Sequence, residues 1–174
     1  MIISVEKAKS LISFPNWTDE KIEMTLKAVE QTIRAYTNNN FQDRDYRRTA
    51  DIVGGLFLVE ALTPFDIGDT VQISESSLNK GLFTVASADD STFTVEETVK
   101  DENDVLVTKI VYPADVIDCC VNLMEWEVNN RGKVGIKSET LSRHSVTYED
   151  SASMFMGYPA SLLGCLKPYR KARC

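Results

Sequence analysis

The chain has few of the residues that enzymes use for catalysis. Among its 174 residues histidine occurs once, as His144, beside Arg143 and Ser145. A Ser-His-Asp triad needs a nucleophile in an activating context, and the sequence contains no G-x-S-x-G motif. Gly54-Gly55 is not followed by the G-K-[ST] of a phosphate loop, and residues 101–107 lack the glycine that a calcium loop needs. We therefore predict that the protein is not an enzyme and uses no cofactor and no metal ion.

Cysteine and long apolar runs are also scarce. The spacing of Cys119, Cys120, Cys165 and Cys174 fits neither a zinc site nor a secreted disulfide framework. Adjacent residues lie about 100° apart around a helix, so the first two thiols do not share a face. We predict four packing or surface thiols in a reducing cytoplasm. No apolar run is long enough for a membrane span, and the short apolar start at residues 1–5 does not resemble a signal peptide.

Positive charge is in the minority. The chain has 19 lysine and arginine residues against 26 aspartate and glutamate residues, a formal net charge of −7. General nucleic-acid binding needs clustered positive charge that displaces counterions, so this balance argues against it. An acidic surface is nevertheless compatible with a channel that DNA passes through without sticking. The 43% hydrophobic content is enough for one core or two small ones.

The strongest helix signal lies at residues 18–38. Its apolar residues recur at steps of four and three and form one stripe, namely Ile22, Leu26, Val29, Ile33 and Tyr36. Thr18 is a suitable N-cap, and Asn38 a suitable stop. Further helices are expected at residues 4–12 and from Pro113 to about residue 130. We expect the last of these, through Val116, Cys120, Leu123, Met124 and Val128, to cover the stripe.

Residues 45–112 change to the pattern of short strands. Gly54-Gly55 separates two apolar stretches, which is a two-residue hairpin signal. Alternating pairs follow about every ten residues, with turn residues between them. The predicted fold class is therefore α+β: a small helical bundle with an inserted antiparallel β domain, either a barrel or a sandwich, and an extended C-terminal arm. The predicted domains are residues 1–44 with 113–174, the helical core and arm, and residues 45–112, the insertion.

The C-terminal region is less regular. Residues 133–149 suggest an extended arm or a hairpin, residues 151–157 a loop, and Pro159 the start of a final helix that Pro168 should interrupt or end. The last residues, 167–173, are basic and aromatic in an otherwise acidic protein. They are either a frayed, soluble end or a docking segment for an acidic partner surface.

Several stretches resemble the head–tail connector proteins of tailed phages and prophages, also called adaptor or head-completion proteins. They are IISVEKAK at 2–9, GDTVQIS at 68–74, GLFTV at 81–85, VYPADV at 111–116, SETLS at 138–142, SVTY at 145–148, GYP at 157–159 and LKPYRK at 166–171. Their order and the long first helix carry the resemblance over nearly the whole chain. The β insertion departs from the minimal helical members of this family.

The resemblance implies a virion structural protein, made in the cytoplasm of a bacterial host and placed at the virion neck. Such proteins form a ring, usually of twelve subunits, beneath the portal protein; they extend the DNA channel and dock the stopper or tail-completion protein. The isolated chain is expected to be a monomer that assembles on the portal, without a membrane. Expected portal-docking residues are Leu166, Lys167, Tyr169, Arg170, Lys171 and Arg173. Expected inter-subunit contacts of the arm are Leu141, Val146 and Tyr148.

A second hypothesis is a small nucleic-acid-binding module that uses the β unit as an oligonucleotide-binding barrel. It would need exposed aromatic side chains beside basic ones on one sheet face. The unit does contain Phe57, Phe65, Phe83 and Phe93, but it is rich in aspartate and glutamate, so the connector hypothesis ranks first.

Overall fold

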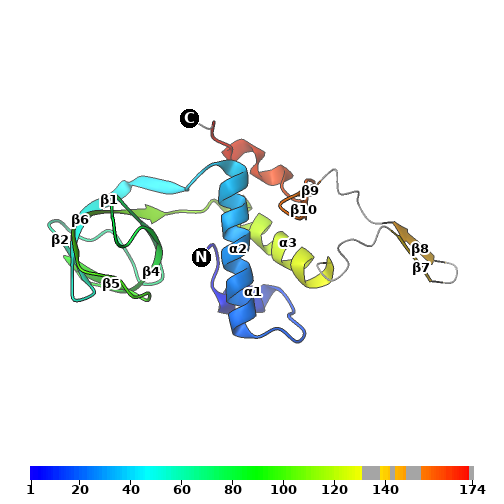
Figure 1. The fold of residues 1–174 in the computed structure, drawn as a ribbon, viewed down its shortest axis with the longest axis horizontal. Coiled ribbons are helices and arrows are strands. Elements are labelled where there is room, and N and C mark those ends of the chain that lie inside the picture. Colours follow the sequence, from blue (N-terminus) through cyan, green and yellow to red (C-terminus); the bar gives the residue numbers. More distant parts are fainter. Residues whose placement is uncertain (131–137, 142–143, 148–153, 173–174) are drawn as a thin grey trace. The chain divides into compact units, whose positions relative to one another are not determined.

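The computed structural model describes residues 1–130, 138–141, 144–147 and 154–172. The chain divides into two compact units (Figure 1). The helical unit comprises Met1–Asn39 and Pro113–Cys174, and the barrel unit comprises Asn40–Tyr112. The fold is α+β, as predicted, because three α-helices accompany a closed antiparallel barrel.

The helices begin and end where local chemistry requires. Helix α1 spans Val5–Leu11, α2 spans Asp19–Thr37 and α3 spans Ala114–Asn130. Thr18 caps α2, since its Oγ1 accepts a hydrogen bond from the Lys21 N–H at 3.3 Å. Asn38 ends α2 in the left-handed conformation, with φ of 47°. Both predicted ends of this helix are confirmed.

Helix α2 buries its apolar stripe in the helical unit. Ile22, Leu26, Val29 and Ile33 are at most 1% exposed, and α2 packs against α3. Tyr36, expected in the same stripe, is half-buried and packs edge-on against Phe155, with ring centroids 5.2 Å apart. The stripe therefore ends one turn earlier than the spacing indicated.

Helix α3 is buried on more than one side. The expected inward residues Val116, Cys120, Leu123 and Met124 are fully buried, while Val128 is only partly buried. Two unexpected residues are buried as well, Cys119 and Glu127. The Tyr158 hydroxyl donates a 2.5 Å hydrogen bond to Glu127 Oε1, which satisfies a carboxylate that would otherwise be costly to bury.

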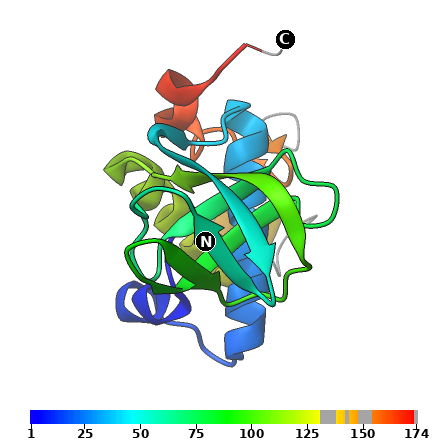
Figure 2. The ribbon, with the colours of Figure 1, turned by 90° about the vertical axis from the view of Figure 1, so that its left-hand side faces the viewer.

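Six antiparallel strands close the barrel (Figure 2), so the prediction's alternative of a sandwich is excluded. They are β1 (Gln42–Val53), β2 (Leu56–Val59), β3 (Thr70–Ser74), β4 (Gly81–Ala88), β5 (Thr92–Val95) and β6 (Glu102–Ile110). They follow one another in the order β1-β2-β5-β4-β3-β6, and β6 pairs with β1. Gly54 and Gly55, with φ of 59° and 85°, make the predicted two-residue turn between β1 and β2.

Inward-facing residues of the strands fill the barrel. Phe57 stacks on Phe93 across β2 and β5, with ring centroids 4.4 Å apart, and Phe65 meets Phe93 edge-on at 5.1 Å. Alternate residues of β6, Val105 and Val107, are fully buried beside them. The period-two pattern of the sequence thus separates a packed interior from an outer face.

The described residues after α3 form short elements. Strands β7 (Ser138–Leu141) and β8 (His144–Thr147) form a hairpin, and β9 (Met154–Phe155) pairs with β10 (Tyr158–Pro159). The predicted helix from Pro159 is wrong: turns lead into a 3₁₀ helix, η3 (Gly164–Tyr169), which contains Pro168. No helix among the described residues is long and apolar enough to cross a lipid bilayer.

Candidate interaction surfaces

The C-terminal segment, residues 164–172, is bound to the end of α2. The Lys171 N–H donates to the Thr37 carbonyl at 2.8 Å. Asn38 Nδ2 donates to the Ala172 carbonyl at 2.9 Å, and Asn39 Nδ2 to the Tyr169 carbonyl at 3.3 Å. The asparagines that end α2 therefore also hold the end of the chain, a role that the sequence pattern did not indicate.

Tyr169 joins the same segment to the first turn of α3. Its hydroxyl lies 2.6 Å and 2.7 Å from the two carboxylate oxygens of Asp115. This hydrogen bond to a negative charge raises the pKa of Tyr169, because the bond is lost when the phenol ionises. Arg170 lies over the ring of Tyr36, with 5.2 Å between the guanidinium carbon and the ring centroid. The segment is thus held in one conformation by both long helices.

The expected portal-docking residues divide into two groups. Leu166 is fully buried, so it belongs to the core of the helical unit and is corrected from a docking residue to a packing residue. Tyr169 is half-buried on Asp115, and Arg173 lies outside the described residues. Lys167, Arg170 and Lys171 are exposed. We call these three residues the basic face.

The expected arm residues fall in and beside the β7–β8 hairpin. Leu141 pairs with His144 at the closed end of the hairpin, and Val146 pairs with Glu139. Tyr148 lies outside the described residues. Residues 133–149 were expected to form an extended arm or a hairpin, and the backbone pairing of residues 138–141 with 144–147 is that of a hairpin.

The net negative charge of the protein belongs to the barrel unit. Residues 40–112 hold 14 acidic and 6 basic residues, a formal net charge of −8. The remaining residues hold 12 acidic and 13 basic ones, a formal net charge of +1. The two units therefore differ sharply in the partners that their long-range electrostatic potentials favour.

The outer face of the barrel exposes aliphatic rather than aromatic side chains. Val53, Leu56 and Leu58 lie on the β1–β2 hairpin and are 54%, 37% and 41% exposed. Phe57, Phe65 and Phe93 point into the core instead. Tyr46 is exposed, with the Lys109 ammonium 5.5 Å from its ring, but Lys109 also pairs with Asp69 at 2.5 Å. Tyr46 is the one exposed aromatic side chain of the barrel unit, whereas the stacking of several bases needs a row of them.

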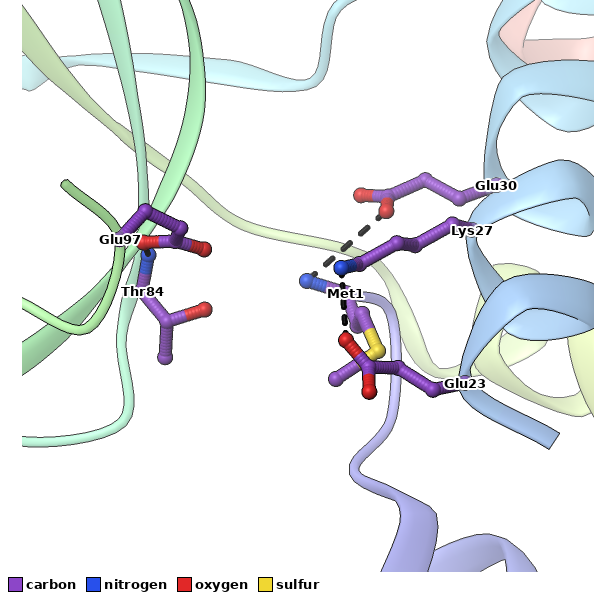
Figure 3. Close-up of polar contacts among 6 residues, drawn as sticks. All are labelled: Met1, Glu23, Lys27, Glu30, Thr84 and Glu97. Carbon is purple, nitrogen blue, oxygen red and sulfur yellow. Dashed lines mark hydrogen bonds and ion pairs between the residues drawn. The ribbon is translucent and has the colours of Figure 1, made fainter. Parts of the chain in front are cut away.

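The solvent-facing side of α2 carries a mixed surface. Glu23 and Lys27 form an ion pair of 2.6 Å one turn apart (Figure 3). Met24, between them in the sequence, is well exposed. A shallow, open depression is lined by Glu20, Glu23, Met24, Lys27, Ala28 and Gln31.

The amino group of Met1 lies 3.8 Å from the buried carboxylate of Glu30, also drawn in Figure 3. The close-up also shows a contact within the barrel, where the Thr84 N–H donates to Glu97 at 2.9 Å.

Within residues 1–130, 138–141, 144–147 and 154–172, no group of three or more histidine, cysteine, aspartate or glutamate side chains is placed to hold a metal ion. Glu127 and Glu30 are buried but have partners in the tyrosine hydroxyl and the amino terminus described above. A search against protein-family models finds no match for this chain, and neither does a search of curated proteins.

Proposed function

We propose that the chain is a structural protein of a phage or prophage virion, a head–tail connector that lies under the portal and docks the stopper or tail. The observation that carries the proposal is the basic face on a bound segment. A docking segment that is already ordered loses less conformational entropy on binding than a frayed end does. The resemblance of the sequence stretches to connector proteins supplies the identity of the partner.

In this proposal the helical unit is the small bundle from which the ring is built. The region from 133 to 148 is the arm that reaches a neighbouring subunit. A closed ring needs two different faces on each subunit, so that one face of a copy binds the other face of the next. The ring, proposed to have twelve subunits, would form on the portal from chains that are monomeric when isolated.

In this proposal the negative charge of the barrel unit helps DNA to pass through the ring. A formal charge of −8 on residues 40–112 would repel the phosphate backbone, and a lumen lined by such a surface would let DNA pass without specific binding. Phe57, Phe65 and Phe93 are buried and Phe83 is partly buried, which does not favour the alternative of a nucleic-acid-binding module. Measuring the affinity of the purified chain for short single strands at two salt concentrations tests that alternative.

The role of the basic face can be tested by charge reversal. Lys167→Glu together with Lys171→Glu should weaken attachment to the portal protein of the same phage by about tenfold, from two exposed ion pairs of up to about 1 kcal/mol each. Both side chains are exposed, so the fold should persist. Binding is measured by surface plasmon resonance at low and high salt, and the loss should shrink as salt screens the charges.

The matched control is Lys7→Glu with Lys80→Glu, which changes the net charge by the same amount at two other exposed positions. It should leave attachment nearly unchanged. Equal losses in the two double variants would mean that only overall charge matters, and undiminished binding of the Lys167/Lys171 variant would remove the basic face from the portal interface.

A further inference from the structure

Two thiols from different parts of the chain converge on one carbonyl oxygen. The Cys119 thiol, on α3, donates to the Leu162 carbonyl at 3.5 Å, and the Cys165 thiol, on η3, donates to the same oxygen at 3.5 Å. Two atoms that each lie 3.5 Å from a third cannot be more than 7.0 Å apart. Cys119 is fully buried and Cys165 is exposed, so an external reagent reaches one thiol of the pair first.

The surroundings of Cys119 and Cys165 differ from those of the neighbouring Cys120. Burial, followed by the proximity of Cys165, raises the pKa of the Cys119 thiol. Cys120 is buried too, but burial and the charge of Glu30, on α2, raise its pKa to about 12. Consecutive helical residues point about 100° apart, so Cys120 faces a different neighbour.

We propose that Cys119 and Cys165 are a modification site that takes a low-molecular-weight disulfide, such as oxidised glutathione, and becomes an internal disulfide. The Cys165 thiolate attacks one sulfur of the reagent, the reagent's S–S bond breaks, and one glutathione thiolate leaves. Cys119 then loses its proton and attacks the Cys165 sulfur, which expels the second glutathione thiolate. The two protein thiols lose two electrons and two protons in total, and the reagent gains them as two glutathione thiols.

The bond would tie η3 to α3 and so hold the segment that carries the basic face. Its formation belongs to an oxidising environment, because cytoplasmic thiols are kept reduced. A virion released from its host enters such an environment, and there the bond would fix the docking segment permanently. This last consequence rests on the proposed function, whereas formation of the bond in the purified protein does not.

The test uses the full chain carrying Cys174→Ser, which removes the terminal thiol as a competitor. The protein is incubated with oxidised glutathione, remaining thiols are alkylated, and the intact chain and its unreduced tryptic peptides are weighed by mass spectrometry. The expected product carries no glutathione, is lighter by two hydrogen atoms and links the peptide of Cys165 to that of Cys119. Its rate should rise by about tenfold per pH unit near neutrality, since Cys119 must ionise far below its raised pKa.

Two added substitutions identify the partners. Cys120→Ser is the matched control, because Cys119 and Cys120 share one tryptic peptide, and the linked product should persist in it. Cys119→Ser should stop at one glutathione on Cys165, with circular dichroism confirming that the variant is folded. A stable glutathione adduct while Cys119 is present, a link to Cys120, or no oxidation at all would each overturn the proposal.

Discussion

At the scale of single residues, the Glu102 carboxylate accepts four hydrogen bonds within the barrel unit. Its carboxylate accepts hydrogen bonds from Ser76 Oγ at 2.6 Å and the Ser77 N–H at 2.6 Å. It also accepts from the Leu78 N–H at 3.3 Å and Asn79 Nδ2 at 2.9 Å. One acid on β6 therefore binds residues 76–79 of the loop between β3 and β4.

These hydrogen bonds, the one from Ser76 foremost, hold the pKa of Glu102 below its ordinary value of 4.5. A lowered pKa means that the ionised form stabilises the fold above pH 4.5, and that this stabilisation is lost as the pH falls through the lowered value. Glu102→Gln replaces one acceptor by a donor, so it should destabilise the barrel at pH 7, and much less at an acidic pH below the lowered pKa of Glu102. Hydrogen exchange of barrel amides at the two pH values measures the difference.

The control for that comparison is Glu60→Gln, at an exposed position near the end of β2. It should leave hydrogen exchange unchanged at both pH values. A Glu102→Gln protein that exchanges like the wild type at pH 7 would show that the loop does not depend on the carboxylate.

Gly55 provides a second prediction at the residue scale. Its φ of 85° is strained for any residue with a Cβ, although a Cβ there would meet nothing within 4 Å. Gly55→Ala should therefore cost about 1–2 kcal/mol of barrel stability from backbone strain alone. Gly164→Ala also meets nothing within 4 Å but has no positive φ, and it should cost far less. Calorimetric unfolding of the two variants gives the comparison, and equal costs would contradict the strain argument.

The residue-scale features that could be predicted from the sequence are local ones. The Thr18 cap, the left-handed Asn38 and the Gly54-Gly55 turn each depend on neighbours within a few positions. The Glu102 network joins residues 23 to 26 positions apart, and the pairing of Tyr169 with Asp115 spans 54. No periodicity or motif signals such contacts, because they arise only once the chain has folded.

At the scale of elements, the buried stripe of α2 packs in the core of the helical unit. Leu26→Ala should cost about 2–5 kcal/mol, because Leu26 is 1% exposed and the truncation leaves a cavity. Met24→Ala, on the exposed side of the same helix, should stay within about 0.5 kcal/mol. Both tryptophans, Trp17 and Trp126, lie in the helical unit, so tryptophan fluorescence during urea unfolding reports this unit alone. Similar costs at the two positions would contradict the assignment of the stripe.

The element that was predicted wrongly from the sequence is the last helix. Leu162, Leu163 and Leu166 fit an α-helical stripe, yet Leu163 and Leu166 are fully buried while Leu162 is half-buried. A spacing of three is the period of a 3₁₀ helix, whose bonds join residues three apart, as in the 3.1 Å bond from the Leu166 N–H to the Leu163 carbonyl. Three leucines are too few to distinguish the period of an α-helix from that of a 3₁₀ helix. Pro168 is accommodated in the 3₁₀ helix.

At the scale of the whole molecule, the insertion of the barrel between α2 and α3 could be read from the change of period alone. The barrel unit begins at Asn40, five residues before the expected boundary. The reason is that β1 begins in a polar stretch, while Phe41 is buried and meets the ring of Tyr112 at 5.0 Å. The contact between Phe41 and Tyr112, which lie at the two ends of the inserted unit, could not be predicted from the composition.

The partition of charge is the property of the whole molecule that most constrains its partners. The barrel unit is acidic, and the helical unit carries the basic face, so the two surfaces favour partners of opposite charge. A connector needs at least two distinct docking faces, one toward the portal and another toward the next component of the neck.

Electron microscopy of the purified chain mixed with its portal protein tests the connector proposal most directly. The account predicts a ring of added density on one end of the portal, coaxial with the DNA channel, with the helical unit nearest the portal. Portal particles that keep their own outline at saturating concentrations of the chain would contradict it.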